Sequence, residues 1–259
     1  MRDFMYGLTD THCHITDERL FSRIDEIMEN AKAAGVVRML VVCVGFEEYE
    51  RAEQLREKGY PLDIALGFHP CDLYKFNEAD YQHLEELAAC KKLIAIGEIG
   101  LDYHWDDVAV EDQKIGFIRQ LKLAEKYHLP VLIHMREATK DTVEILLQHS
   151  CVGVMHCYSG SYETAEILIR HGYYISYGGP LTFKNSRGAP QVAVKLPIER
   201  LLIETDCPYL TPHPFRGKEN EPKYISYTFE KLCEIRDMEK EVLAEQLEQN
   251  YCRLFYQEG

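Results

Sequence analysis

The sequence lacks the cysteine pattern of a disulfide-rich or zinc-ribbon protein. Its nine cysteines are scattered over 259 residues, their number is odd, and no two of them form a Cys-x-x-Cys pair. Neither a small fold held together by disulfides nor a structural zinc ribbon is therefore expected. The scattered thiols instead indicate a reducing environment.

Long hydrophobic runs are also absent from the chain. No segment approaches the roughly 18 uninterrupted apolar residues that a membrane-spanning helix needs. The first four residues include an aspartate, and they are not followed by the apolar core of a secretion signal. We therefore expect a cytoplasmic setting, no contact with membranes and no obligate protein partner.

Positive charge is scarce, because 29 Lys and Arg stand against 43 Asp and Glu, a net charge of −14. This balance argues against a protein that coats nucleic acid through a basic surface. It does not exclude a nuclease whose positive charge comes from metal ions. Hydrophobic residues make up 46% of the chain, so a disordered protein is excluded, and the length predicts one large α/β domain over residues 1–259.

Short β-branched or aliphatic runs alternate with segments that carry apolar residues at three- and four-residue spacing. This alternation predicts a (β/α)8 TIM barrel. A doubly wound sheet is the alternative, but His-Cys-His stands after the first run where that fold has a glycine-rich phosphate loop. Gly35, Gly59 and Gly172 are expected to end helices, and residues 226–256 to form a helix. The eight predicted strands are residues 7–12, 36–44, 63–68, 93–99, 131–134, 153–156, 173–176 and 201–205.

Polar side chains gather at the ends of these predicted strands, and the carboxyl ends of barrel strands open on one face. The residues are His12, His14, His69, Glu98, His134, His156 and Asp206. Side chains two apart on a strand share a face, so both imidazoles of His12-Cys13-His14 point inward while Cys13 points to the helices. Cys157 and Cys207, which also follow predicted ligands, are likewise expected to pack as small apolar residues.

Six of these side chains, the four histidines other than His69 together with Glu98 and Asp206, are more ligands than one catalytic zinc uses. Two metals that share a bridging carboxylate fit this number better. We expect His12 and His14 on one ion, His134 and His156 on the other, and Glu98 between them. Asp206 is expected to bind the first ion and to take a proton from the attacking water. Zn, Mn, Fe or Ni suit such an imidazole-rich site, and Mg suits it less.

Each of these residues also has an ordinary structural interpretation. A lone histidine at a strand end, such as His69, His104 or His213, is usually a hydrogen-bonded structural residue, and Glu98 alone reads as a buried, paired acid. His83, His128, His149 and His171 fall on helices or helix ends. Together, however, the six predicted ligands would be very costly to bury in one lumen without compensating metal charge.

With these residues identified, the chain closely resembles the TatD family of metal-dependent deoxyribonucleases. The resemblance implies a barrel, the six metal ligands named above, and hydrolysis of phosphodiester bonds in DNA. Thr9, where an aliphatic residue is usual, and Tyr158, where Phe is commoner, depart from the family pattern. The motifs are Asp10-Thr11-His12-Cys13-His14, Gly67-Phe68-His69-Pro70, Gly97-Glu98-Ile99-Gly100-Leu101-Asp102, Pro130-Val131-Leu132-Ile133-His134-Met135-Arg136, His156-Cys157-Tyr158-Ser159-Gly160 and Glu204-Thr205-Asp206-Cys207-Pro208-Tyr209-Leu210.

Several cations and acids around these motifs are candidates for the substrate side. Arg136, two residues after His134, and Arg216 are expected to hold phosphate oxygens, with His69 as a further substrate contact. The neighbouring loops also carry Lys184, Arg187, His213 and Lys218, for which an ordinary solvated loop is the alternative. Asp10 and Glu204, each two residues before a ligand, are expected to orient imidazoles or water.

Three functions remain open at this point. The first is an exonuclease that releases nucleotides from single-stranded DNA ends. The second is an amidohydrolase or lactonase that opens a small cyclic amide or ester with the same two-metal chemistry. The third is a metal-bound scaffold without catalytic activity. The acidic residues lie mostly on predicted helices such as residues 47–57 and 239–248, so a nuclease of this charge would bind long DNA weakly.

Overall fold

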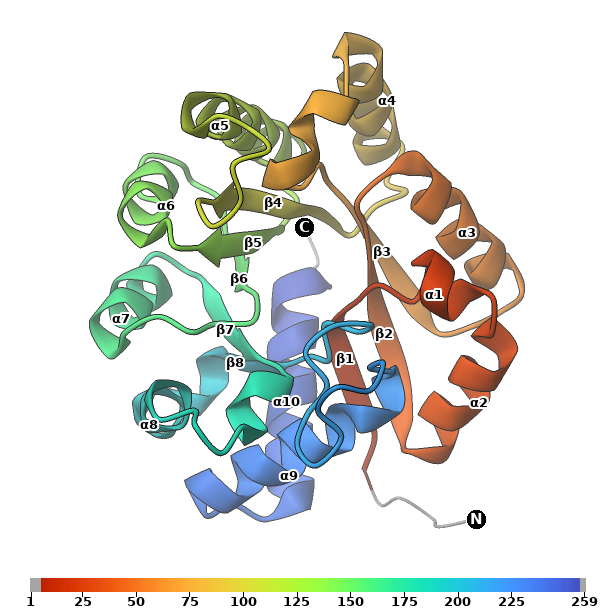
Figure 1. Cartoon of the computed structure of the whole chain (residues 1–259), viewed down its shortest axis with the longest axis vertical. Coiled ribbons are helices and arrows are strands. Elements are labelled where there is room, and N and C mark those ends of the chain that lie inside the picture. Colours follow the sequence, from red (N-terminus) through yellow and green to blue (C-terminus); the bar gives the residue numbers. More distant parts are fainter. Residues whose placement is uncertain (1–5, 257–259) are drawn as a thin grey trace.

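Eight parallel strands follow one another around a nearly closed barrel in the order in which they occur in the chain (Figure 1). The computed structural model describes residues 6–256, so the expectation drawn from the first four residues lies outside the described part. The barrel predicted from the sequence pattern is confirmed. The strands are β1 (Leu8–Cys13), β2 (Val36–Cys43), β3 (Leu62–Leu66), β4 (Ala95–Asp102), β5 (Val131–Arg136), β6 (Gly153–Met155), β7 (Tyr174–Tyr177) and β8 (Leu201–Ile203).

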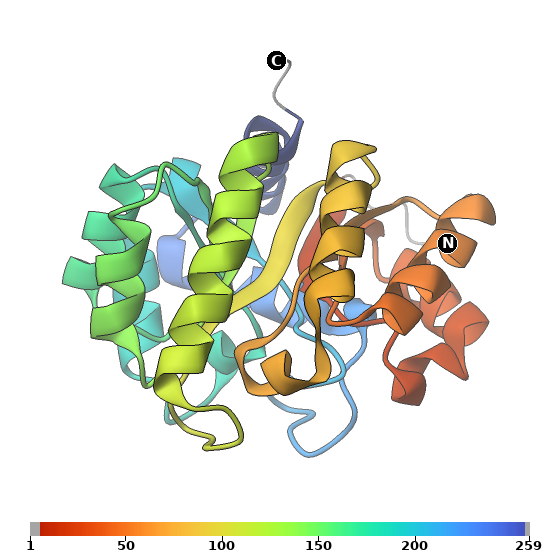
Figure 2. The same cartoon turned by 90° about the horizontal axis from the view of Figure 1, so that it is seen from above.

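Helices surround the sheet, and the loops that follow the strands gather at one end of the barrel (Figure 2). Among residues 6–256, no helix is long and apolar enough to cross a bilayer. The α-helices are α1 (Glu18–Phe21), α2 (Ile24–Ala33), α3 (Phe46–Glu57), α4 (Glu78–Ala89), α5 (Val110–Tyr127), α6 (Thr139–Leu146), α7 (Tyr162–Arg170), α8 (Gly188–Lys195), α9 (Ile225–Arg236) and α10 (Lys240–Phe255). Short 3-10 helices are η1 (Pro70–Lys75), η2 (Gly179–Thr182), η3 (Ile198–Arg200) and η4 (Pro222–Tyr224).

Local signals in the sequence placed several helix ends correctly. Gly35, Gly59 and Gly172 have φ of 85°, 86° and 99°, the left-handed conformation that closes a helix. The single helix expected over residues 226–256 is wrong, because Asp237 takes a left-handed φ of 50° and separates α9 from α10. Aspartate tolerates this conformation better than most residues, so the break carried no glycine or proline signal.

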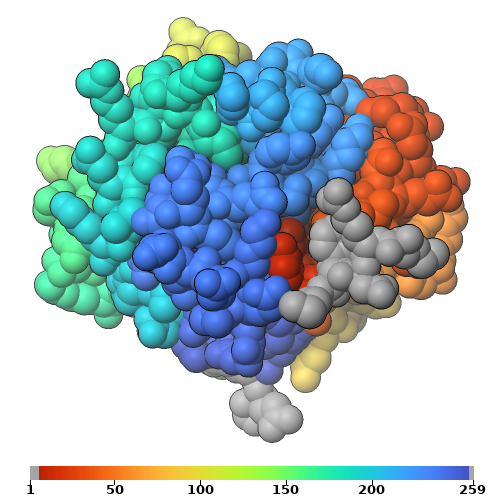
Figure 3. Space-filling model, turned by 90° about the horizontal axis from the view of Figure 1, so that it is seen from below, coloured from red at the N-terminus to blue at the C-terminus, as the bar shows by residue number. Residues whose placement is uncertain are grey.

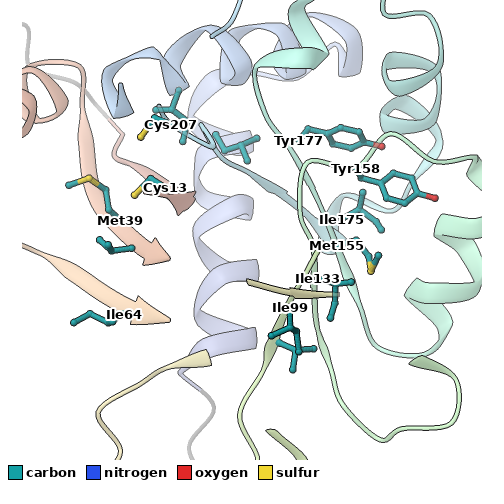
Figure 4. Close-up of a cluster of buried hydrophobic side chains, with 14 of the residues drawn as sticks. Cys13, Met39, Ile64, Ile99, Ile133, Met155, Tyr158, Ile175, Tyr177 and Cys207 are labelled. Atoms are coloured by element: carbon teal, nitrogen blue, oxygen red, sulfur yellow. The ribbon is translucent and has the colours of Figure 1, made fainter. Parts of the chain in front are cut away.

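Side chains of the strands alternate between two apolar layers. One layer faces the helices, and Figure 4 shows one such side chain from each of strands β1 to β7. Cys13 and Cys207 are fully buried in this layer, as predicted for small apolar residues. Cys157 differs, because it is half-buried and lines a cavity of about 190 Å³ beside the loops after β6 and β7. The layer's labelled strand residues are Cys13, Met39, Ile64, Ile99, Ile133, Met155 and Ile175.

The second apolar layer lies inside the barrel and packs against α10. Tyr251, Leu254 and Phe255 of α10 belong to the same buried cluster as inward-facing residues of seven strands, β2 to β8. The Tyr251 hydroxyl donates a 2.7 Å hydrogen bond to Asp63 on β3. The amino-terminal end of the barrel is therefore packed, and the polar residues collect at the other end. The strand residues of this cluster are Leu40, Val42, Ala65, Ala95, Leu132, Val154, Tyr174 and Leu202.

The barrel closes where the first and last strands meet, so residues from opposite ends of the chain lie side by side (Figure 3). The Thr11 hydroxyl donates to the carbonyl oxygen of Ile203 at 2.9 Å. Beyond the end of β8, Asp206 N–H donates to the His12 carbonyl at 2.9 Å, and His14 N–H donates to the Cys207 carbonyl at 2.8 Å. The closure is thus made by the segments that carry three of the predicted metal ligands.

Candidate metal centre

The six predicted ligands converge at the carboxyl end of the barrel. His12, His14, Glu98 and Asp206 are at least 93% buried, and His134 and His156 are partly buried. They come from β1, β4 and β5, from the residues that directly follow β1 and β6, and from the third residue after β8. Residues far apart in the sequence meet here because all eight strands run in the same direction.

One group of donor atoms consists of His12 Nε2, His14 Nε2, Asp206 Oδ1 and Glu98 Oε2. The two imidazole nitrogens are 3.2 Å apart, and Asp206 Oδ1 lies 3.9 Å and 3.5 Å from them. Glu98 Oε2 lies 3.4 Å from His12 and 3.7 Å from His14. A zinc ion with bonds of about 2.1 Å has tetrahedral ligands roughly 3.4 Å apart, so these four atoms are spaced to hold one ion.

A second group lies on the other oxygen of Glu98. Glu98 Oε1 is 2.7 Å from His134 Nδ1 and 2.8 Å from His156 Nε2, and these two nitrogens are 3.5 Å apart. The ring of His12 stacks on that of His156 with centroids 4.1 Å apart, so the two groups are in direct contact. Each oxygen of Glu98 therefore faces a different set of imidazoles, which is the geometry that a bridging carboxylate needs.

In three of the rings, the nitrogen that points away from the centre faces a hydrogen-bond acceptor. The nitrogen that points into the centre is therefore free to bind a metal. His14 Nδ1 donates to the Val42 carbonyl at 2.9 Å, and His134 Nε2 donates to Asp102 Oδ2 at 2.8 Å. His156 Nδ1 lies 3.3 Å from Glu204 Oε1, with ion-pair rather than hydrogen-bond geometry. Such outer partners orient metal-binding imidazoles and set their tautomer. Glu204 thus lies beside a ring of the centre, and its role in orienting that ring stays a prediction.

Charge in the centre is balanced between the carboxylates and the imidazoles. Burial opposes ionisation of Glu98, but His156, His12 and His134 outweigh it and hold the pKa of this carboxyl well below its usual range. Burial also opposes protonation of His14, yet its bond to Asp206 and the charge of Glu98 raise its pKa to about 9. A cation that replaces these protons would find the carboxylates already ionised.

Buried polar atoms without partners also surround the centre. In the described part of the chain, His12 Nδ1, His156 Nδ1 and Glu204 Oε2 are buried and accept or donate no hydrogen bond. Unpaired buried polar atoms cost free energy, and they are retained at functional sites. The four imidazoles and two carboxylates beside them form a donor set that fits divalent transition metals.

Asp102 is a site residue that the sequence reasoning missed. The predicted strand ended at residue 99, whereas β4 continues to Asp102 and brings its carboxylate to His134. The same carboxylate accepts hydrogen bonds from the N–H groups of His104 and Trp105 at 2.9 and 3.4 Å. The sequence did carry a signal for Asp102: it lies four residues after Glu98, and residues separated by an even number of positions on one strand share a face.

His69 lies beside this pair and forms with Asp102 and His134 a further group that could hold a metal ion. Its Nδ1 accepts the N–H of Cys71 at 3.3 Å, so the neutral ring carries its proton on Nε2. Burial lowers the pKa of His69 to about 4, which keeps the ring neutral. Nε2 is 3.9 Å from Glu98 Oε1 and is therefore a hydrogen-bond donor aimed at the centre.

Asp10 does not orient an imidazole as the sequence analysis expected. Its two carboxylate oxygens accept from the N–H of Thr205 at 2.9 Å and from the Thr205 hydroxyl at 2.5 Å. Burial raises the pKa of this carboxyl to about 7. The side chain thus ties β1 to the segment after β8, and it acts on the centre by holding the backbone beside Asp206.

Gly100 allows the strands that carry Glu98 and His134 to approach closely. Its φ is +146°, and a Cβ atom there would lie 2.0 Å from the carbonyl oxygen of His134. Any other residue would have to push β5 away from β4. The glycine of the Gly-Glu-Ile-Gly motif therefore positions both ligands.

The predicted substrate arginines lie at the end of β5 and on loops at the same end of the barrel, and they have no acidic partner. Among the described residues, seven arginines form ion pairs, and Arg136, Arg187 and Arg216 are three of the six that do not. Arg136 lies over the ring of Trp105 at 5.7 Å, and Arg216 over that of Phe183 at 4.1 Å. Unpaired guanidinium groups at this end of the barrel suit an anionic substrate.

The other predicted histidines of this end take structural positions. The backbone N–H of His213 donates to Thr182 at 2.8 Å, and His104 Nδ1 lies 2.7 Å from Glu137 on the exposed surface. Thr9 contacts Glu248 of α10 at 2.7 Å, and the Tyr158 hydroxyl bonds to the Ser161 carbonyl at 2.7 Å. Neither departure from the family pattern contacts a predicted ligand.

Comparison with known proteins places this barrel in a family. Residues 9–256 match the TatD related DNase family. The uncharacterized metal-dependent hydrolase YabD of Bacillus subtilis is 43% identical over 251 residues, 96% of this chain and 98% of the relative. YcfH of Escherichia coli, described in the same words, is 34% identical over 96% of both chains.

A solved structure agrees with this assignment. The crystal structure of YJJV, a TatD homolog from Escherichia coli, superposes with a TM-score of 0.91 at 34% identity, and the match covers 97% of this chain and 98% of that one. Fold and donor set together define the class of protein as a metal-dependent hydrolase on a (β/α)8 barrel. Within that class, the chain belongs to the TatD family.

Proposed function

We propose that this protein is a deoxyribonuclease that hydrolyses phosphodiester bonds at single-stranded ends of DNA. The observation that carries the proposal is Glu98, whose two oxygens face two separate groups of imidazoles at distances of 2.7 to 3.7 Å. Family membership supports DNA as the substrate. The unpaired arginines at the same end support an anionic substrate over a neutral cyclic one.

In this proposal each ion has its own set of ligands. His12, His14 and Asp206 would hold one divalent cation, His134 and His156 would hold the other, and Glu98 would serve both. The chemistry supplied by two cations bound there would be orientation of the scissile phosphate, neutralisation of its charge and activation of water as a nucleophile. Zn, Mn, Fe and Ni suit this donor set better than Mg, which prefers oxygen ligands.

Asp206 is the proposed general base. Burial opposes its ionisation, but a bond from His14 and the charge of His156 lower the pKa of the carboxyl, so it is ionised at neutral pH. Its left-handed φ of 56° turns the side chain into the centre while its N–H stays bonded to His12. From this position the carboxylate accepts a proton from the attacking water.

The remaining groups bind and orient the substrate. His69, neutral with its proton on Nε2, donates to a phosphate oxygen. Arg136 and Arg216 hold phosphates by paired N–H groups, which is the geometry that guanidinium offers. The net charge of −14 disfavours long duplexes, whereas local cations at one end of the barrel serve a strand terminus.

The test is a nuclease assay on single-stranded oligonucleotides labelled at the 3′ or the 5′ end, run with each divalent metal in turn. We expect stepwise release of nucleotides from one end and no cleavage of a circular single strand. Equal rates on circular and linear strands would contradict the exonuclease preference. Turnover of lactones or cyclic amides without nucleotide release would instead support the amidohydrolase alternative.

A further inference from the structure

Exposed aromatic side chains gather at the end of the barrel that carries the metal centre. In residues 6–256, four aromatic residues are largely exposed, and three of them lie on loops after β3, β4 and β8, which share this end (Figure 2). They are Tyr74, Trp105 and Tyr209, with 68%, 54% and 47% of their surface exposed. Large apolar surface in contact with water is unfavourable, and its clustering indicates a binding surface.

Trp105 is the member of this group that is held most directly to the centre. Its backbone N–H donates to Asp102 Oδ1 at 3.4 Å, while Asp102 Oδ2 accepts from the proposed ligand His134 at 2.8 Å. The neighbouring N–H of His104 bonds to the same Asp102 oxygen at 2.9 Å. The loop that presents the indole is therefore positioned by the carboxylate that orients a proposed metal ligand.

A cation accompanies the indole. The guanidinium of Arg136 lies 5.7 Å from the centre of the Trp105 ring, and no acidic group among the described residues pairs with it. The ring of His104 also contacts the indole, with centroids 4.8 Å apart and planes at 88°, and 54% of the surface of Trp105 stays exposed. An aromatic face next to an unpaired cation is the surface that binds single-stranded nucleic acid.

We propose that Trp105 is a stacking platform for one base of the single-stranded substrate, with Arg136 on the phosphate beside that base. The inference rests on the proposed nuclease function and specifies its substrate as a strand with unpaired bases. Inside a duplex both faces of each base are covered by its stacked neighbours, so only a terminal base pair could use this contact. Because every base has a π-face, the platform would bind all four bases.

The fluorescence of Trp105 tests the contact directly, because it is the only tryptophan in the sequence. Zinc-loaded protein is titrated with a phosphorothioate oligothymidylate, which resists hydrolysis, and with an abasic strand of the same length and charge. We expect saturable quenching with the base-containing strand and little change with the abasic one. Equal quenching by both strands, or none by either, would overturn the proposal.

Kinetics of variants provide the second readout. Trp105→Ala is expected to lower kcat/KM on oligonucleotides about 5- to 150-fold, mainly through KM, with substantial recovery in Trp105→Phe. Hydrolysis of bis(p-nitrophenyl) phosphate, which has no base, should stay at the wild-type rate. Ile115→Ala is the control for the loss of an exposed apolar side chain, because Ile115 is 66% exposed on α5. It should change neither oligonucleotide hydrolysis nor hydrolysis of bis(p-nitrophenyl) phosphate.

The two proposals fail in different ways. Loss of both activities in Trp105→Ala, or oligonucleotide kinetics unchanged from those of Ile115→Ala, would overturn the platform while leaving the nuclease in place. If wild-type protein hydrolyses no phosphodiester at all, the proposed function fails. The fluorescence titration then decides alone whether Trp105 contacts bases.

Discussion

The backbone N–H of Asp206 donates a 2.9 Å hydrogen bond to the carbonyl oxygen of His12, so two proposed ligands of one ion also join the last strand segment to the first. The Asp10 carboxylate reinforces this closure through Thr205, next to Asp206. Closure of the barrel and assembly of the donor group are therefore one structural event. Stability of the fold and occupancy of the centre should consequently be coupled.

Removal of the metals is expected to destabilise the folded protein. A ligand present at 100 times its Kd adds about 2.7 kcal/mol to the free energy of unfolding. For a chain of this length, that corresponds to roughly 5–10 °C in Tm. Thermal unfolding of chelator-treated protein, with and without added zinc, measures the shift. An unchanged Tm in samples whose metal content differs by two equivalents would contradict the coupling.

Glu98→Gln is expected to lower metal content from about two equivalents to one or fewer and to abolish hydrolysis. The amide keeps the volume but loses the charge and one oxygen that a bridge requires. Mass spectrometry of protein purified without chelators measures the content. Glu111→Gln, on the exposed outer face of α5, is the matched control. A Glu98 variant with full metal content and activity would disprove the bridge.

Asp206→Asn tests the general base. We expect a loss of about 100- to 10,000-fold in kcat, since the amide cannot accept the proton, while His12, His14 and Glu98 retain most of the metal. Asp237→Asn is the control. Asp237 also has a left-handed backbone, with a φ of 50°, but it separates α9 from α10, so its substitution should leave kcat unchanged. Full activity in the Asp206 variant would remove the residue from the mechanism and revive the scaffold alternative.

Metal loading is expected to release protons. The pKa of His14 is raised to about 9 by Asp206 and Glu98 against the effect of burial, so in the ion-free protein this ring is protonated at pH 7. Binding requires the neutral ring, so metal affinity should increase as the pH is raised toward roughly 9 and decrease as the pH is lowered. Calorimetry in buffers of different ionisation enthalpy counts the protons. Release of none at pH 7 would contradict the pairing described for His14.

Gly100→Ala is expected to lower the free energy of unfolding by about 3 kcal/mol, because the added Cβ would meet the His134 carbonyl and φ is +146°. Chemical denaturation measures the change. Gly188→Ala is the control, since nothing lies within 4 Å of a Cβ there, and it should be neutral or slightly stabilising. Equal stabilities of the two variants would show that β4 and β5 can separate at no cost.

Much of the architecture was predictable because its signals are local. Alternating apolar runs indicated the eight strands, and glycines after periodic segments marked three helix ends. The failures have local causes too. Asp237 breaks the last helix without a glycine, and β4 extends past residue 99 because Gly100 lets it pair with β5 through Asp102. Neither the close approach of two strands nor a left-handed aspartate is visible in hydrophobic periodicity.

The amino-acid order alone was enough for the barrel and for six donors at its carboxyl end, because strand direction and side-chain alternation follow from the chain itself. Which atoms face one another depended on folding. The two oxygens of Glu98 face different imidazoles, Asp102 joins His134 to Trp105, and Asp10 bonds to Thr205 instead of a ring. These relationships depend on the register and spacing between strands that are distant in sequence, and only packing sets that register.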